Sequence, residues 1–204
     1  MVARLAVLLA FAFALAMPAA AQTSASPDNI LVLETNKGTV EIALRPDLAP
    51  QHVARIKELA REGFYDGVVF HRVIDGFMAQ TGDVANGNME NDFNISRAGT
   101  GGSDMPDLPA EFSKIPHARG SIGAARSASP NSANSQFFIM FDDGAFLDGQ
   151  YTIVGEVVVG MDVVDAIKLG TGANGAVIGE ADAMDVVRVI SADELSDIVD
   201  AAAQ

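Results

Sequence analysis

The 204-residue sequence contains no cysteine and no tryptophan, and only two tyrosines. The absence of cysteine excludes disulfide bonds, thiolate metal sites and cysteine nucleophiles. Basic residues are also few, because 13 Lys and Arg stand against 27 Asp and Glu. Such an acidic surface repels phosphate, so we exclude nucleic acid as a partner. The length indicates one domain that can bury a sizeable core.

The chain has one long apolar run, at its N-terminus. Arg4 precedes an uncharged run from Leu5 to Met17, and the small residues 19–21 follow, a pattern typical of a secretory signal peptide. The run has 13 residues, whereas a transmembrane helix needs about 20. We therefore predict a signal peptide over residues 1–21, a periplasmic or otherwise exported protein and no stable membrane insertion; a retained anchor is the alternative. Without the leader the net charge is −15, from 12 basic and 27 acidic residues.

Alternation, helical spacing and turn residues predict the elements that follow a polar linker at residues 22–28. Strands are expected at Ile30–Thr35, Thr39–Leu44, Val68–Ile74, Gly120–Ala125, Gln136–Phe141, Ile153–Val159 and Met184–Ile190, and Phe77, Met78 and Gln80 form a further extended run. Helices are expected at Pro50–Glu62, with Gly63 as C-cap, and at Asp162–Leu169. Val84–Glu111 is rich in Gly, Asn and Asp and predicts a long irregular loop. Residues 192–204 form an acidic tail with no assigned function.

Many strands without a strand-helix-strand rhythm predict a mostly β chain. The pattern favours an antiparallel barrel capped by helices. Periodicity alone leaves a β-sandwich open.

An arginine with apolar neighbours marks the most informative segment, FHRVIDGFMAQTGD at Phe70–Asp83. On a strand, Phe70, Arg72 and Ile74 would share one face. Ordinary core packing beside a surface arginine also accounts for this pattern, because arginine commonly lays its stem along apolar surface.

A second segment, SQFFIMF at Ser135–Phe141, favours a functional interpretation over ordinary core packing. Together with the FHRVIDGFMAQTGD segment it resembles the cyclophilin-type peptidyl-prolyl cis-trans isomerases, specifically their bacterial exported type. A third match is FLDG at Phe146–Gly149, which comes before the predicted strand containing Val154 and Gly155. The matches fall in family order and span Asn29–Ser191, the predicted isomerase domain.

The resemblance implies a closed eight-stranded antiparallel β-barrel capped by two α-helices. It also implies an enzyme that accelerates rotation about X-Pro bonds and so assists the folding of exported proteins. Arg72 takes the role of catalytic arginine. The residues that would bind substrate are Phe77, Met78, Gln80, Arg126, Ser127, Gln136, Phe138, Phe146, Leu147 and Tyr151.

The chemistry suits an arginine beside an apolar pocket. The prolyl amide resists rotation because the nitrogen lone pair is delocalised into the carbonyl, with a barrier of about 18–20 kcal/mol. A guanidinium is permanently charged and offers fixed donors, so it can stabilise the twisted amide more than the planar one. We expect no covalent intermediate, no cofactor and no metal.

Three positions depart from familiar members of the family. Phe146 stands where many members of animals and fungi carry tryptophan, so we expect weak cyclosporin binding. Tyr151 stands where those members carry histidine, which excludes an essential histidine there. Arg126 adds a positive charge at the groove and favours acidic residues before the proline.

Other motif-like patterns are discounted. GTGANG at Gly170–Gly175 fits a dinucleotide fingerprint literally, but it follows a predicted helix and therefore indicates a loop. Asp142 and Asp143 are read as a solvated turn. The three histidines lack metal-ligand spacing, and no serine-nucleophile elbow occurs.

Two rival functions remain open. A binding module could capture proline-containing segments of unfolded exported proteins with little turnover, although Arg72 and the pocket aromatics favour the enzyme. A structural or receptor-type protein has only the acidic surface in its favour. We take a monomer as the default.

Overall fold

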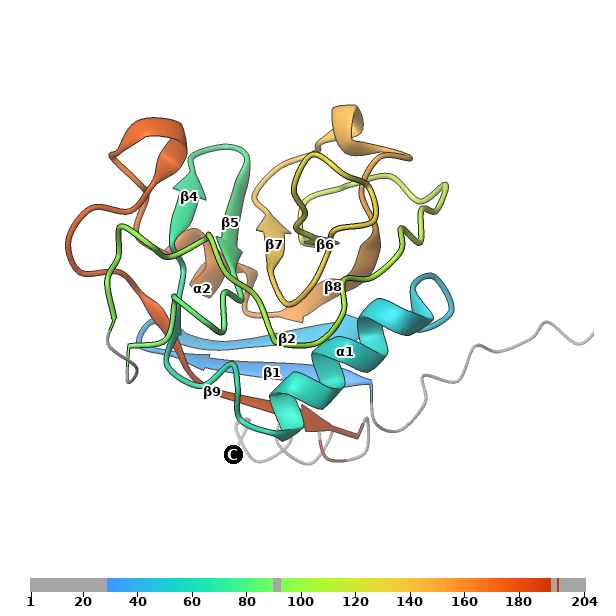
Figure 1. Cartoon of the computed structure of the whole chain (residues 1–204), viewed down its shortest axis with the longest axis horizontal. Coiled ribbons are helices and arrows are strands. Elements are labelled where there is room, and N and C mark those ends of the chain that lie inside the picture. The colour runs from blue at the N-terminus through green and yellow to red at the C-terminus, as the bar shows by residue number, and fades with distance from the viewer. Residues whose placement is uncertain (1–28, 90–92, 192–193, 195–204) are drawn as a thin grey trace, which may run out of the picture.

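The computed structural model describes residues 29–89, 93–191 and 194. The segments assigned to the signal peptide, the linker and, apart from Glu194, the C-terminal tail lie outside them. The described part contains the following strands, helices and 3-10 turns (η), in chain order (Figure 1): β1 Ile30–Thr35, β2 Gly38–Leu44, α1 Pro50–Arg61, β3 Val68–Val69, β4 Arg72–Ile74, β5 Met78–Thr81, β6 Ser121–Ala124, β7 Phe137–Met140, η1 Ala145–Leu147, β8 Ile153–Val159, α2 Met161–Asp165, η2 Ala173–Gly175 and β9 Ala183–Ile190. None of the helices in this described part is long and apolar enough to cross a membrane.

All the strands belong to one antiparallel sheet with the order β3-β9-β1-β2-β8-β6-β7-β5-β4. Its two end strands, β3 and β4, are separated in the chain by only Phe70 and His71. The amide of Phe70 donates to the carbonyl of Asp182, which precedes β9, whereas the amide of His71 donates to Gln80 in β5. The chain thus changes neighbours between these two residues, and the sheet curls until its ends meet in one segment.

The mostly β, antiparallel fold with two helices is therefore confirmed. The structure has nine strands rather than eight because the predicted strand Val68–Ile74 is divided into β3 and β4. The same division corrects the predicted alternation. Phe70 packs in the main core with Val73, whereas Ile74 packs in a second apolar cluster.

The main core fills the inside of the curled sheet and is closed by the helices. It includes Leu33 and Ile42 of the first hairpin and Ile139 of β7, all fully buried. The helix α1 lies across the sheet in Figure 1 and packs against β9. Its apolar stripe is buried: Val53, Ile56, Leu59 and Ala60.

The ends of the two helices have identifiable causes. The helix α1 ends at Arg61, one residue before the prediction, and Gly63 follows with the positive φ (73°) that favours glycine after a helix. The helix α2 ends at Asp165 rather than Leu169. The amide of Lys168 donates to the carboxylate of Asp182 instead of to a helical carbonyl, and this contact draws the chain out of the helix.

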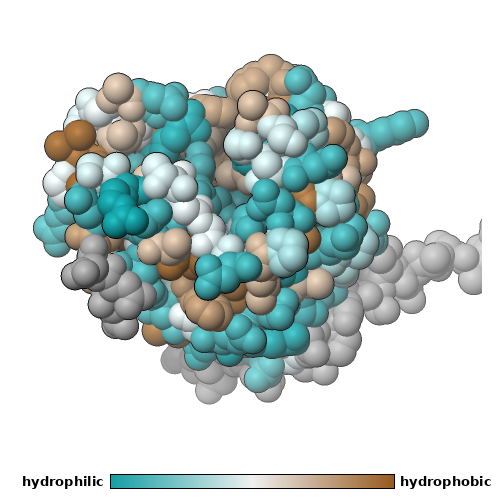
Figure 2. Space-filling model, viewed as in Figure 1, coloured by the Kyte–Doolittle hydropathy of each residue, from teal (hydrophilic) through white to brown (hydrophobic). Residues whose placement is uncertain are grey.

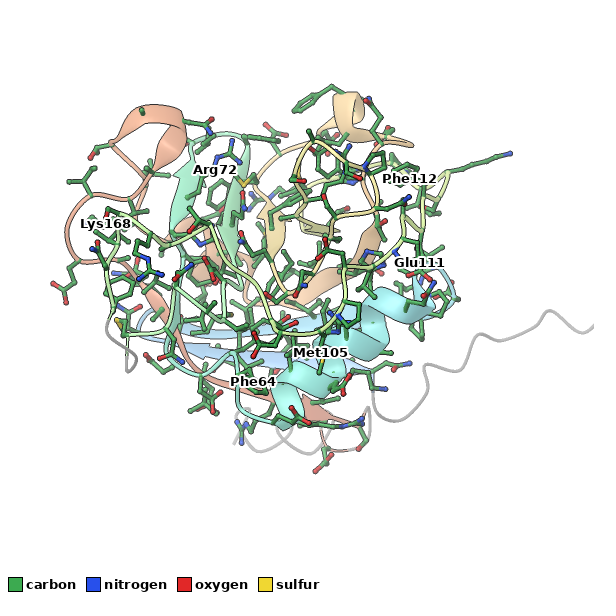
Figure 3. All side chains as sticks on the ribbon, in the orientation of Figure 1. Phe64, Arg72, Met105, Glu111, Phe112 and Lys168 are labelled. Carbon is green, nitrogen blue, oxygen red and sulfur yellow. The ribbon has the colours of Figure 1, made fainter. Side chains whose placement is uncertain are left out.

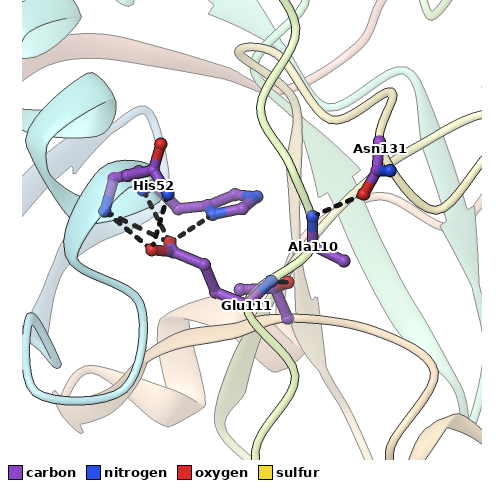
Figure 4. Close-up of polar contacts among 6 residues, drawn as sticks. His52, Ala110, Glu111 and Asn131 are labelled. Atoms are coloured by element: carbon purple, nitrogen blue, oxygen red, sulfur yellow. Dashed lines mark hydrogen bonds and ion pairs between the residues drawn. The ribbon is translucent and has the colours of Figure 1, made fainter.

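The long loop predicted at Val84–Glu111 is irregular where it is described, and two acidic residues fix it. The carboxylate of buried Asp83 accepts hydrogen bonds from the amides of Gly99 and Gly101 at 2.7 and 2.9 Å. At the other end, Glu111 accepts from the amides of Gln51 and His52 in the first turn of α1 and from the His52 ring (Figure 4). These contacts hold the loop against the body of the protein.

Candidate active site

Arg72 lies on β4 with its guanidinium held on two sides. Nη1 donates to Oε1 of Gln80 on the paired strand β5 at 3.1 Å. On the opposite side Nε donates to the backbone carbonyl of Asn174 at 2.9 Å, and Nη2 donates to Oδ1 of the same residue at 3.2 Å. Figure 3 shows Arg72 near the β4–β5 hairpin, beside the orange segment that contains η2. The half-buried guanidinium is therefore fixed in direction.

The hydrogen bonds of Gln80 continue into the long loop. Nε2 of Gln80 donates to Oε1 of Gln136 at 3.0 Å. Gln136 in turn donates to the carbonyls of Gly99 and Gly101 at 3.2 and 2.7 Å. Because Asp83 holds the amides of both glycines, the chain of contacts from Arg72 ends at a buried carboxylate. Both glutamines are thus fixed in one orientation.

An apolar hollow of about 360 Å³ opens beside Arg72. It is lined by Arg72, Phe77, Met78, Gln80, Ala125, Arg126, Phe138, Phe146, Leu147 and Tyr151. In Figure 2 a notch at the upper edge of the molecule lies between two lobes, in the region of this hollow. We call it the proline hollow. Its lining includes nine of the predicted site residues and adds Ala125.

The floor and one wall of the proline hollow are aromatic. The ring of Phe138 lies between the His117 ring, stacked at 6.4 Å, and the Tyr151 ring, which meets it edge-on at 5.8 Å. Phe77 and Phe146 form a tilted pair at 5.4 Å, and Phe146 is 64% exposed. An apolar ring of a ligand can therefore be enclosed from below while its attached chain remains in solvent.

A second hollow of about 400 Å³ adjoins the first and contains the remaining predicted residues, Ser127 and Gln136. Gln80, Ala125 and Arg126 line both hollows. The glycine-rich part of the long loop, from Gly99 to Gly102, forms the far wall of the second hollow. All the predicted site residues thus lie around one continuous groove.

Arg126 stands where the two hollows meet. Its Cζ lies 4.3 Å from the centroid of the Tyr151 ring, an attractive cation-π arrangement. Nη1 and Nη2 donate to the carbonyls of Ser127 and Gln150, both at 2.9 Å. These partners carry no charge, so the positive charge of Arg126 remains available to a ligand.

Burial governs the titration of the groups around Arg72. It lowers the pKa of the Arg72 guanidinium, but arginine stays protonated in proteins. It also lowers the pKa of the neighbouring His71 to about 4. His71 is therefore neutral at physiological pH, and Arg72 is the cation at this end of the groove.

Sequence reasoning missed three contributors to the site. Asn174 lies in the GTGANG segment, which the sequence indicates only as a loop and which contains the 3-10 turn η2 in the structure. Gly123 supports the Phe138 ring, since a Cβ there would lie 2.1 Å from Cζ of that ring. His71 packs against Gly99. Only the asparagine-glycine pair at 174–175 gave a signal, because it marks a tight turn.

This arrangement can bind an apolar five-membered ring and direct a fixed guanidinium at the attached amide. Arg72 can donate to an amide whose nitrogen lone pair has become localised, and this favours the twisted state over the planar one. Within residues 29–89, 93–191 and 194, no group of three or more His, Cys, Asp or Glu side chains is placed to hold a metal ion.

Comparisons with known proteins identify the family. The model of the cyclophilin-type peptidyl-prolyl cis-trans isomerases matches residues 30–193. A probable peptidyl-prolyl cis-trans isomerase of Brucella suis biovar 1 (strain 1330) is 64% identical over 173 residues, which is 83% of this chain and 88% of the relative. The chain therefore belongs to the cyclophilin family, and it is a peptidyl-prolyl cis-trans isomerase (EC 5.2.1.8).

Two solved structures share the fold. The cyclophilin AquaCyp293 of Hirschia baltica is 28% identical, with a TM-score of 0.66 over 79% of this chain and 74% of its own. A Cryptosporidium parvum cyclophilin type isomerase, crystallised in the presence of the dipeptide Ala-Pro, is 21% identical. Its TM-score is 0.66 over 78% of this chain and 98% of its own.

Proposed function

We propose that this isomerase acts on X-Pro bonds of exported proteins, with Arg72 as its catalytic residue and without a covalent intermediate. The observation that carries the proposal is the placement of the Arg72 guanidinium at the wall of the proline hollow, fixed by Gln80 and Asn174. An unattached arginine would have to be ordered during each turnover, whereas this one is ordered beforehand.

In the proposed complex the pyrrolidine ring of the substrate lies on Phe138, between Met78 and Leu147. Apolar burial of the ring anchors one side of the amide. The chain on the amino side of the proline lies along Gln136 and the backbone at Arg126 and Ser127. The crystallisation of the Cryptosporidium parvum relative in the presence of Ala-Pro agrees with a proline-containing ligand.

Catalysis then consists of holding one side of the amide while the other turns. Arg72 donates to the amide as it twists, so this contact strengthens along the reaction. The site needs no nucleophile and no cofactor. A binding module that only captures proline segments would not need an arginine fixed on two sides.

The proposal that the clients are exported proteins is supported by the sequence pattern at residues 1–21. The test is to express the full chain in its host and to separate periplasm from cytoplasm. The intact mass of the protein in each fraction then identifies its first residue. We expect the periplasmic fraction to contain a chain that begins near Gln22. A cytoplasmic protein that retains Met1 would contradict this part of the proposal.

We further propose that Arg126 gives a preference for an acidic residue before the proline. Support comes from the charges that line the proline hollow, where both charged side chains are arginines, on a protein with a formal net charge of −14. Arg126 borders both hollows, so a carboxylate on either side of their boundary lies close to it.

The test compares one peptide with Glu, Gln or Lys before the proline. We expect kcat/KM to be about threefold higher for Glu than for Gln, as for a partly exposed ion pair. The difference should shrink at high salt and disappear in Arg126→Gln. An equal Glu preference in Arg126→Gln would show that this residue is not its source.

We also propose weak cyclosporin binding, a monomeric state and no affinity for nucleic acid. Phe146 is an exposed hydrocarbon ring at the rim of the proline hollow and has no hydrogen-bond donor to offer. Titration of the purified protein with the drug tests the first of these. Nanomolar affinity would contradict it.

A further inference from the structure

The outer edge of β4 is covered by the segment 170–177, which contains the GTGANG motif. The amide of Gly170 donates to the carbonyl of Val73, and the amide of Val177 donates to that of His71. Between these two contacts, Arg72 and Ala176 form an isolated antiparallel bridge. The segment is thus attached to the strand that carries Arg72.

Asn174 occupies the turn of this segment in a left-handed conformation, with φ 56° and ψ 30°. Among the described residues it is the one non-glycine residue with positive φ. This conformation costs most residues about 1 kcal/mol or more, whereas asparagine adopts it comparatively readily. It places both the backbone carbonyl and the side-chain Oδ1 of Asn174 within hydrogen-bond distance of the same guanidinium.

We propose that Asn174 is a positioning residue for catalysis: it fixes the guanidinium of Arg72 for the reaction through a two-point contact. The inference rests on the proposed catalytic role of Arg72. Asn174 is not among the residues that line the proline hollow, so it acts through the arginine rather than on the substrate.

The hydrogen-bond count of Arg72 shows what the contact achieves. A guanidinium has five N–H groups. Two of them bind Asn174 and a third binds Gln80. Among the described residues, the guanidinium makes one other contact, a weak one between Nη1 and Sδ of Met78 at 3.9 Å. The second hydrogen of Nη2 and the weakly held second hydrogen of Nη1 therefore remain for the twisted amide.

The neutrality of Asn174 matters as much as its geometry. A carboxylate at this position would also accept from Nε and Nη2, but it would neutralise the positive charge that the twisted amide needs. An amide oxygen and a backbone carbonyl hold the guanidinium and leave its net charge intact. Asparagine supplies both acceptors from one residue and tolerates the turn.

The test compares Asn174→Gly with Ala173→Gly and Arg72→Ala, each in the mature chain from Gln22. Glycine adopts the left-handed turn without strain, so Asn174→Gly removes Oδ1 without distorting the backbone. Ala173→Gly adds similar backbone freedom to the same turn and leaves Oδ1 in place. Prolyl exchange in a short X-Pro peptide is measured by NMR below and above KM, together with the Nε–H signal of Arg72.

We expect Asn174→Gly to lower kcat about 10-fold, the equivalent of one charge-assisted hydrogen bond. KM should change less than about twofold, because the apolar hollow that binds the proline ring is untouched. The Nε–H signal of Arg72 should exchange with water faster than in the parent. Its acceptor, the backbone carbonyl of residue 174, is retained, but without the contact between Nη2 and Oδ1 the guanidinium turns more freely. Ala173→Gly should behave like the parent in both measurements.

Two results would overturn the inference while leaving the role of Arg72 intact. One is parent-like turnover in Asn174→Gly when Arg72→Ala is inactive. The other is an equal loss in Asn174→Gly and Ala173→Gly, which would make turn rigidity the cause. If Arg72→Ala retains full turnover, the proposed function of Arg72 fails, and the inference about Asn174 fails with it.

Discussion

The ring of Phe138 lies directly on the backbone of Gly123 in the neighbouring strand, so closely that a Cβ at position 123 would be 2.1 Å from Cζ of the ring. Nothing in the sequence around Gly123 predicts this contact. It nevertheless sets the depth of the proline hollow, because the ring above it can approach the strand only where no side chain is present.

The first prediction concerns this contact. Gly123→Ala should push the Phe138 ring into the space that the substrate ring needs, because the interior is close-packed. We expect kcat/KM to fall about 10-fold, in keeping with an overpacking penalty of about 1–3 kcal/mol. The same overpacking should lower the free energy of unfolding, and adding Phe138→Leu should restore it. This restoration would distinguish local crowding from a general effect on β6. Parent-like kcat/KM in Gly123→Ala would contradict this account of the pocket floor.

The second prediction concerns Glu111, which acts as a distant cap for α1. The helix has no side-chain cap of its own and no acidic residue in its first turn. Burial acts to raise the pKa of Glu111, but hydrogen bonds from His52 and from the amides of Gln51 and His52 outweigh it, so the pKa lies below its usual value. Glu111→Ala should lower the free energy of unfolding at pH 7 by about 2 kcal/mol.

The dependence of this effect on pH has a defined sign. A carboxylate with a lowered folded-state pKa stabilises the protein above its unfolded-state pKa and loses that contribution as the pH falls through the folded-state value. The difference between parent and Glu111→Ala should therefore shrink in acid. Glu180→Gln removes one exposed charge and serves as the control for net charge. A difference that does not change with pH would exclude the charged cap.

The third prediction concerns His71, whose pKa burial lowers to about 4. The unfolded chain protonates this residue near pH 6.5, so between about pH 6.5 and 4 the unfolded state binds the additional proton. Stability should decrease as the pH falls through this range, by up to about 3 kcal/mol from this group. In His71→Gln the free energy of unfolding should depend less on pH over the same range. An identical slope in both proteins would show that His71 titrates normally in the fold.

Much of the fold could be predicted because its signals are local. The strands Ile30–Thr35 and Ile153–Val159 agree with the structure to the residue, since alternation and flanking turns mark their ends. The division of Val68–Ile74 could not be predicted in the same way. It depends on Asp182, which is distant in sequence and accepts from the amide of Phe70, whereas Gln80 across the β4–β5 hairpin accepts from the amide of His71.

The same distinction applies to the site. The side chains around the proline hollow carry recognisable residue types in recognisable segments, and the structure brings all of them to one groove. The groups that fix the long loop and the Arg72 guanidinium carry no such signal in the sequence. Glu111 lies 59 residues from His52, and Asn174 lies 102 residues from Arg72. Neither pair leaves a periodic or spaced pattern, so tertiary structure was needed to reveal them.

The central claim is that Arg72 performs the isomerisation while the rest of the groove binds the peptide. The most direct measurement is prolyl cis-trans exchange in a short X-Pro peptide, followed by NMR, with residues 22–204 of the parent and of Arg72→Ala. Arg97→Ala, which removes one exposed cation, controls for charge. Peptide affinity and thermal stability are measured in the same samples.

The account predicts that the parent and Arg97→Ala accelerate exchange strongly, whereas Arg72→Ala loses about 10²-fold in kcat, as expected for the loss of a preorganised charged donor. Peptide affinity and stability should remain close to those of the parent, because the proline hollow is retained. Exchange in Arg72→Ala at the rate of the parent would contradict the account.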